Sequence, residues 1–299
     1  MKHAYLIIAH GEPYILEKLL KSIDDERNDI YIHIDKKWKD FDFNYFKKIV
    51  EKSNLYFTKR LDVRWGTYKL IECELLLFKA ARKNDRYAYY HLLSGVDMPL
   101  KNQSIIHEYF DKNQGKEFIC YDHHDNVQQE TVDRIKYYHL FTSKFKNKGF
   151  LARVWNSLHY RLISLQKKLR VDRCKDLHVQ KGAQWVSITS DLVDYIIFNE
   201  KQIKKIFKYS YCADEVFIQT MVYNSNFYDM VESRKDDDYH YIKRLIDWKR
   251  GEPYTFKKED YNELINSDCF FARKFSTKVS KEVVDMLYNY VKGEKNGKI

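Results

Sequence analysis

The first hundred residues alternate short apolar runs with longer stretches in which apolar residues recur every three or four positions. The short runs have the length of buried strands and lie at residues 4–9, 29–35, 55–58 and 89–93. Helical spacing is clearest at residues 15–23, and it returns at residues 44–53 and from the segment at 63–66 to about residue 83. Strands that alternate with helices in this way predict an α/β fold with a central, mostly parallel sheet and helices on both faces.

The second half of the chain is less regular. From about residue 122 to 180 the pattern weakens into polar, basic and aromatic sequence, which we interpret as a variable insertion. Later patterns predict a helix at 190–198, a helix that starts near Asp214, a strand at 242–248 and an amphipathic helix at 281–292. Because no repeat or low-complexity linker interrupts the sequence, we expect a single domain over residues 1–299.

The strand that begins at residue 89 is followed by the segment SGVDMP at residues 94–99. Gly95 can adopt backbone conformations closed to other residues, and Pro99 cannot donate a ladder hydrogen bond, so we expect a turn that exposes Asp97. Ligands of open α/β sheets bind beyond the carboxyl ends of the strands, which makes Asp97 a candidate site residue. The alternative is that Asp97 only caps the next helix. The same sheet edge is predicted to hold Asp35, Arg64 and Trp65.

The chain of 299 residues is basic, with 53 Lys and Arg against 43 Asp and Glu and a net charge of +10. This balance favours anionic partners such as nucleic acid, an acidic membrane surface or a phosphorylated ligand. Aromatic residues make up 16% of the chain, and their rings pack in cores but also stack on sugars or bases. Composition alone does not choose among these partners.

The five cysteines are widely spaced and form no CxxC pair. Their odd number and spacing argue against a disulfide framework and against a zinc site, and they favour a reducing cytosol. The apolar run at the N-terminus is too short for a signal peptide, and no stretch reaches the ~18 apolar residues of a membrane span. We therefore expect any membrane contact to be peripheral.

Two pairs of charged residues are candidates for chemistry. Asp214 and Glu215 precede an apolar helical pattern, where one acid can cap the helix while the other points from its first turn as an ionised proton acceptor. On spacing alone, a pair that only caps the helix is the favoured interpretation. Arg273 and Lys274 lie between aromatic residues, and two fixed cations suit a diphosphate. A strand edge with solvated charges explains this second pair equally well.

Two other groups have residues that bind metal ions. Asp236, Asp237 and Asp238 resemble the acidic triplet with which many nucleotide-sugar enzymes hold a divalent cation, but they do not follow an apolar strand. The DHHD run at residues 122–125 has suitable residue types but no i, i+4 spacing. A metal-dependent enzyme that uses residues 236–238 stays an alternative.

A basic, aromatic-rich chain is also compatible with nucleic-acid binding. The sequence has no helix-turn-helix pattern, no RNP-like aromatic strand and no zinc finger, and it lacks the GxGxxG and GxxxxGK[ST] motifs. Nucleic-acid binding is therefore an alternative without a supporting motif.

Taken in order, seven segments resemble glycosyltransferase family 14, the core-2/I-branching β-1,6-N-acetylglucosaminyltransferases and peptide O-xylosyltransferases. They are AHG at 9–11, IHIDK at 32–36, VRWG at 63–66, SGVDMP at 94–99, GAQW at 182–185, DE at 214–215 and FARKF at 271–275. Ordered motifs along most of the chain are far more specific than any one of them. The region at about 122–179 is not covered.

The resemblance implies a Rossmann-like GT-A domain, a UDP-sugar donor, inversion at the anomeric carbon and no divalent metal or other cofactor. It assigns the general base to Glu215 and the diphosphate to Arg273 and Lys274, with Arg244 as a helper. It assigns the uridine to Ala9, Asp35, Val63, Arg64 and Trp65. It implies that Asp97 contacts sugar hydroxyls and that Gln184 and Trp185 line the cleft.

The resemblance also implies substrates and a location. The expected donor sugar is GlcNAc, xylose or similar, and the expected acceptor is a carbohydrate or a lipid-linked saccharide of surface polysaccharide or glycoconjugate synthesis, bound on the side of the insertion. The animal enzymes have a membrane anchor and disulfides, which this sequence does not show. We therefore expect a bacterial, cytoplasmic member that contacts the anionic inner face of the cytoplasmic membrane peripherally and does not bind nucleic acid.

Overall fold

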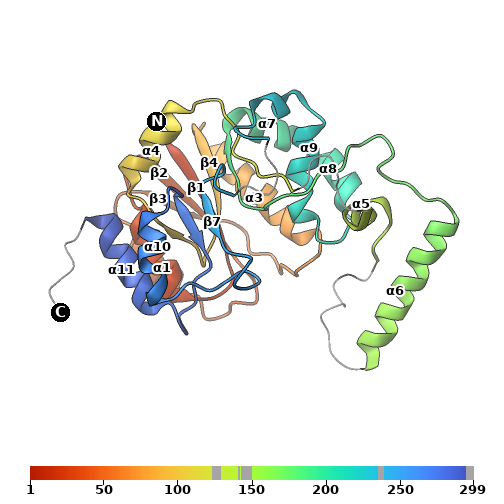
Figure 1. Cartoon of the computed structure of the whole chain (residues 1–299), viewed down its shortest axis with the longest axis horizontal. Helices are drawn as coiled ribbons and strands as arrows, with labels where there is room; N and C mark the ends of the chain where they lie inside the picture. The colour runs from red at the N-terminus through yellow and green to blue at the C-terminus, as the bar shows by residue number, and fades with distance from the viewer. Residues whose placement is uncertain (123–128, 141, 143–149, 235–238, 294–299) are drawn as a thin grey trace.

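A five-stranded sheet forms the centre of the protein (Figure 1). The computed structural model describes residues 1–122, 129–140, 142, 150–234 and 239–293. In the sheet order β3-β2-β1-β4-β6, the first four strands are parallel and β6 is antiparallel to β4. The strands are β1 (His3–Ala9), β2 (Asn28–Ile34), β3 (Asn54–Phe57), β4 (Tyr89–Ser94) and β6 (Ser187–Thr189). The predicted α/β class with a mostly parallel sheet is confirmed.

The central strands are buried on both faces because helices cover both. Every residue of β1 and β2 is buried. Alternate side chains of β1 enter different cores, so Tyr5 and Ile7 pack on one face while Leu6 and Ile8 pack on the other. The first face is covered by α1 (Pro13–Ile23), α4 (Gln103–Lys112), α10 (Tyr261–Asn266) and α11 (Lys281–Lys292). The second face is covered by α3 (Lys69–Asn84), α7 (Ser190–Phe198), α8 (Glu200–Phe207) and α9 (Phe217–Tyr223).

The remaining short elements connect this framework. They are α2 (Phe43–Lys48), η2 (Ala213–Glu215), η3 (Asn226–Met230) and η4 (Lys258–Asp260). The predicted bounds of α7 and α11 match the structure, whereas α2 ends five residues before the predicted residue 53. The helix predicted to start near Asp214 is a 3₁₀ turn, and the α-helix begins at Phe217.

A second sheet of three strands, in the order β5-β8-β7, lies beside the first (Figure 1). The sequence predicted only its strand β7, at residues 242–248. Its strands are β5 (Met98–Pro99), β7 (Arg244–Ile246) and β8 (Phe271–Arg273). Two details of the predicted turn at 94–99 are therefore wrong. Pro99 does not end pairing, because it lies in β5 opposite β8. Gly95 is not among the glycines with positive φ; a Cβ there would instead lie 2.8 Å from Cβ of Ala9, so close packing requires glycine.

The segment interpreted as an insertion contains two helices that the sequence pattern did not predict. They are α5 (Gln129–Lys136) and α6 (Phe150–Lys168). Figure 1 shows α6 at the edge of the molecule, away from the central sheet. The apolar residues of α6 do not mark a core face, because many of them are exposed.

The structure also bears on the cysteines and on membrane spans. All five cysteines are buried, and none is in a disulfide bond. Among the described residues, no helix combines the length and the apolarity needed to cross a membrane.

Candidate active site

The sequence motifs meet through backbone hydrogen bonds at one edge of the central sheet. The amide of Asp35 donates to the carbonyl of Ala9 (2.8 Å), and the amide of Phe275 donates to that of Val96 (3.0 Å). The amide of Gly182 likewise donates to the carbonyl of Glu215 (2.9 Å). Segments far apart in the sequence are thus fixed next to one another by the fold.

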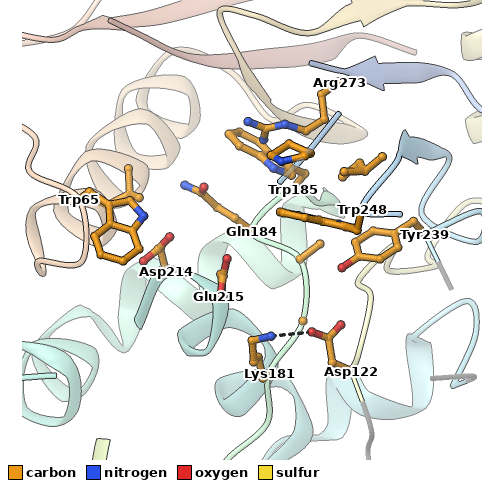
Figure 2. Close-up of a pocket in the computed structure, with 15 residues that line it drawn as sticks. Trp65, Asp122, Lys181, Gln184, Trp185, Asp214, Glu215, Tyr239, Trp248 and Arg273 are labelled. Carbon is orange, nitrogen blue, oxygen red and sulfur yellow. Dashed lines mark hydrogen bonds and ion pairs between the residues drawn. The ribbon is translucent and has the colours of Figure 1, made fainter. Parts of the chain in front are cut away.

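A cavity of about 680 Å³ opens at this edge and is lined by side chains from several motifs (Figure 2). Its polar lining includes both acids of the DE motif and one cation of the FARKF motif. Its residues include Trp65, Asp122, Lys181, Gln184, Trp185, Asp214, Glu215, Tyr239, Trp248 and Arg273. A volume of this size suits a nucleotide-sized ligand.

The two adjacent acids differ in their surroundings. Asp214 is 8% exposed, whereas the side chain of Glu215 is 39% exposed. Burial, and then the charge of Glu215, raise the pKa of Asp214 to about 7. Burial also raises the pKa of Glu215, but the cations Lys181 and Arg134 oppose that rise. The buried acid therefore keeps a proton more readily than its neighbour.

Neither acid caps a helix, so the interpretation favoured on spacing is wrong. The residue before η2 is Cys212 and the residue before α9 is Val216, and neither helix start has a side-chain cap. The backbone at Cys212 has φ of 47° and its amide donates to the carbonyl of Gly66 (3.1 Å). This turn places both acids at the cavity and joins them to the VRWG motif.

Two cations flank Glu215. Nη1 of Arg134, in α5, lies 3.9 Å from Oε2 of Glu215. Nζ of Lys181 also lines the cavity and forms an ion pair of 2.9 Å with Oδ2 of Asp122 (Figure 2). These positive charges favour the ionised form of Glu215 in the folded protein.

Arg273, at the end of β8, lines the cavity and has two buried hydrogen-bond donors without a partner among the described residues. Its guanidinium carbon lies 3.9 Å from the ring centre of Trp185, so the two planes are in contact (Figure 2). Nε is 3.7 Å from Oδ1 of Asp97. Neither Nε nor Nη1 has a hydrogen-bond acceptor among the described residues. With only 15% of its side chain exposed, Arg273 is not the solvated charge of a strand edge.

The prediction that the turn exposes Asp97 is wrong, because Asp97 is buried behind Arg273. Its Oδ2 accepts a hydrogen bond from the amide of Ser94 (2.9 Å), and its Oδ1 has no hydrogen-bond partner among the described residues. Burial raises the pKa of Asp97, and the charge of Arg273 opposes the rise. The helix that follows is capped by Asn102, not by Asp97.

Gln184 is held by an acid that sequence reasoning missed. Its Nε2 donates to Oε1 of Glu74 (2.8 Å). Glu74 lies in α3 and is fully buried. Burial raises the pKa of Glu74 well above its ordinary value. The same wall requires glycine at 182, because a Cβ there would lie 1.8 Å from the carbonyl oxygen of Cys120. Lys181 and Arg134 were missed too, since only tertiary packing brings them to Glu215.

The residues expected to hold uridine form a second group at the same sheet edge. Asp35 is buried just beyond β2, and its Oδ1 accepts from the amide of Lys37 (2.8 Å). Nζ of Lys37 lies 3.3 Å from Oδ2 of Asp35 and donates to the carbonyl of Val63. Arg64 is exposed and pairs with Asp62 (3.0 Å), whereas Trp65 lines the cavity. Lys37 therefore links Asp35 to the segment that leads to Trp65.

Two of the predicted cations are not among the described residues that line the cavity. Arg244 is buried in β7 and donates to Oγ of Ser187 (3.0 Å) and to the carbonyl of Val186 (3.2 Å). Burial lowers the pKa of Arg244 to about 10. Lys274 is half-buried next to Arg273. Of the predicted cations, the structure brings only Arg273 into the cavity.

The two candidate metal groups fall largely outside the described residues. The structure does not describe the acidic triplet Asp236, Asp237 and Asp238 or residues 123–125 of the DHHD run. The first residue of that run, Asp122, is described and pairs with Lys181. Within the described ranges, ligand atoms of His240, Asp268 and Cys269 lie within 4.8 Å of one another. This group does not line the cavity, and Lys243 already pairs with Asp268 (2.9 Å).

Comparisons with known proteins agree with the motifs. A family model described as Core-2/I-branching enzyme matches residues 3–268. Xylosyltransferase 2 of Rattus norvegicus is 24% identical over 311 residues, which cover 95% of this chain and 33% of that protein. Xylosyltransferase sqv-6 of Caenorhabditis briggsae is 24% identical over 293 residues, which cover 90% of this chain and 34% of that protein. The chain thus spans about a third of the length of these relatives.

The apo structure of mouse xyloside xylosyltransferase 1 aligns with 91% of this chain and 97% of its own, at a TM-score of 0.41 and 10% identity. That similarity is too low to support an inference about function.

Proposed function

The chain belongs to the Core-2/I-branching enzyme family, and we propose that it is an inverting glycosyltransferase that moves a sugar from a UDP-sugar to an acceptor hydroxyl without a divalent metal. One observation carries this proposal: the cavity holds both a part-exposed carboxylate, Glu215, and an arginine, Arg273, with unused donors. Inverting transfer needs a base for the acceptor and positive charge for the departing diphosphate. The two residues supply these functions within one cavity.

Glu215 is the general base of the proposed reaction. The acceptor hydroxyl attacks the anomeric carbon while its proton moves to Glu215 and UDP departs from the opposite face. Arg134 and Lys181 oppose the rise in the pKa of Glu215 that burial causes, whereas burial raises the pKa of Asp214 to about 7. A positioned base of this kind accelerates proton transfer by ~10²–10⁴-fold.

Arg273 binds the diphosphate and stabilises the charge that develops as the bond to the sugar breaks. The ring of Trp185 fixes its guanidinium, so little rearrangement is needed when the leaving group gains charge. Asp97 balances the positive charge before the ligand binds. In this proposal Lys274 and Arg244 assist from outside the cavity wall, and no divalent cation is required.

The donor occupies the sheet edge, with uridine near Ala9, Asp35 and residues 63–65 and with the sugar near Asp97, Gln184 and Trp185. The link through Lys37 supports a continuous path from Asp35 to Trp65. We propose GlcNAc, xylose or a similar sugar as the group transferred, and a carbohydrate or lipid-linked saccharide as the acceptor, at the cytoplasmic face of a membrane.

A binding experiment tests the proposal. UDP and a panel of UDP-sugars are titrated into the protein in excess EDTA, with ADP as the control nucleotide. A donor that binds the folded state raises the melting temperature, and calorimetry then gives its dissociation constant. Binding of UDP with no shift by ADP supports the proposal. The absence of binding to every UDP compound, with or without Mn²⁺, contradicts it.

A further inference from the structure

Among the described residues, the contacts of helix α6 with the rest of the protein come from one of its sides. Figure 1 shows it at the edge of the molecule beside α5. Gln166 exchanges hydrogen bonds with the backbone of Tyr138 (2.8 and 3.1 Å), and Lys167 pairs with Asp133 of α5 (2.9 Å). The ring of His159 contacts that of His139 at 5.2 Å. These contacts fix the orientation of α6 relative to α5.

A stripe of apolar residues runs along another side of α6 and is largely exposed. Its members recur every three or four residues, which places them on one side of a helix. They are Phe150, Val154, Leu158, Leu162, Leu165 and Leu169. Phe150 is 77% exposed and Leu169 68%, and only Leu162 is of intermediate exposure. A row of exposed leucines of this length is unusual on a soluble surface and marks a contact site.

The charges beside this stripe have one sign. Residues 150–170 contain five Lys and Arg and no Asp or Glu. Of the cations, Lys167 pairs with Asp133, whereas Arg153, Arg161, Lys168 and Arg170 are exposed. On the helix, Arg161 and Lys168 lie close to the apolar stripe, because each is three or four residues from one of its members. An apolar stripe flanked by cations alone is complementary to an anionic lipid surface.

We propose that the apolar stripe of α6 and its flanking cations form a docking surface for an anionic lipid bilayer, with α6 lying in the interfacial plane. This inference rests on the proposed function, because it explains how a lipid-linked acceptor reaches Glu215. Arg134 of α5 contacts Glu215, and the preceding residue of α5, Asp133, pairs with Lys167 of α6. Docking through α6 therefore brings the side of the cavity near Glu215 towards the lipid surface.

A second copy of this chain is the main rival occupant of the stripe. Two such helices would bring eight like charges together, four exposed cations from each copy, with no acid on either helix to compensate. Anionic lipid headgroups remove that repulsion, so the charge pattern favours a membrane.

The test is sedimentation of the full chain with vesicles of phosphatidylglycerol and phosphatidylcholine, compared with phosphatidylcholine alone. We expect binding to the anionic vesicles that weakens as salt is added. The variant Arg161→Gln/Lys168→Gln should bind about twenty- to thirtyfold more weakly. The variant Phe150→Gln/Leu165→Gln/Leu169→Gln should bind these vesicles at least about tenfold more weakly than the wild type. The affected residues are exposed, so both variants should fold with near-normal melting temperatures.

The matched control is Lys47→Gln/Lys48→Gln, which removes the same charge from exposed positions on α2. It should bind vesicles like the wild type. If it weakens binding as much as the α6 charge variant does, the contact depends on net charge and the proposed surface is wrong. The proposal is also overturned if the apolar variant binds vesicles as well as the wild type does. It is overturned too if sedimentation velocity shows a dimer that depends on α6 while the protein does not bind vesicles. UDP binding measured on the same proteins reports on the proposed function separately, because α6 does not line the cavity.

Discussion

Replacing Arg273 by Ala gives the sharpest prediction about the donor site. The change removes a guanidinium whose Nε and Nη1 have no hydrogen-bond partner among the described residues. Charge-assisted hydrogen bonds contribute about 1.5–3 kcal/mol each. Nε already lies 3.7 Å from Asp97, so we take the lower limit for the hydrogen bonds from Nε and Nη1. Together they give a loss of about 3 kcal/mol in the free energy of UDP binding. The dissociation constant for UDP should therefore rise about a hundredfold.

The loss of stability should be smaller than the loss of affinity. The contact between Arg273 and Trp185 contributes about 0.5–2 kcal/mol, and it disappears in the variant. Asp97 loses its nearby cation, but burial already raises its pKa, so it can take up a proton instead of remaining as an unpaired charge. The melting temperature should fall by only a few degrees.

Calorimetry with UDP in EDTA and thermal unfolding on the same samples measure both quantities. Lys274→Ala is the matched control, because it removes the adjacent positive charge from a residue that does not line the cavity, and it should weaken UDP binding by less than Arg273→Ala does. Arg273→Lys keeps the charge but loses the planar fork, so its affinity should be intermediate. A folded Arg273→Ala protein that binds UDP as well as the wild type would refute the assignment of the diphosphate site.

Three further predictions concern the cavity wall. Glu215→Gln should keep UDP-sugar binding while single-turnover transfer slows by ~10²–10⁴-fold; near-normal turnover in the folded variant would remove Glu215 as the base. Asp214, with a pKa of about 7 against an ordinary 3.8, contributes stability that is complete below about pH 4 and is lost as the pH rises through 7. Asp214→Asn should therefore raise the free energy of unfolding in urea at pH 8 relative to the wild type, with little change at pH 4; an equal effect at both pH values would contradict the shifted pKa. Gly182→Ala places a Cβ 1.8 Å from the Cys120 carbonyl oxygen, so it should lower the free energy of unfolding by about 1–3 kcal/mol or more. An unchanged melting temperature would show that the backbone there can move.

The elements that the sequence predicted well are those whose periodicity is set by burial. The central strands are buried on both faces and α7 and α11 pack against the sheet, so continuous and helical apolar patterns marked them. The strands β5 and β8 have two and three residues, which is too short for any pattern, and β7 was predicted at 242–248 but has only three residues. Helix α6 was missed although its apolar residues recur every three or four positions, because the surrounding polar, basic and aromatic sequence was interpreted as an insertion.

The candidate site divides in a similar way. Asp97 and Glu215 could be named from the sequence because each follows or precedes a recognisable element, and Arg273 because aromatic residues flank it. Glu74 and Arg134 could not, because each lies in a helix and reaches the cavity only through tertiary packing. The turn at Cys212 has a left-handed backbone at a residue other than glycine, and no local signal distinguishes it from an ordinary helix start.

We propose that this chain transfers a sugar from UDP with inversion, using its own cations in place of a metal. The most direct test is a transfer assay in excess EDTA, with the UDP-sugar that most raises the melting temperature and a panel of saccharide acceptors, followed by NMR of the anomeric proton in the product. We predict that transfer continues in EDTA and that an α-linked UDP-sugar gives a β-linked product. A product that retains the α configuration, or activity that EDTA abolishes and Mn²⁺ restores, would contradict the account.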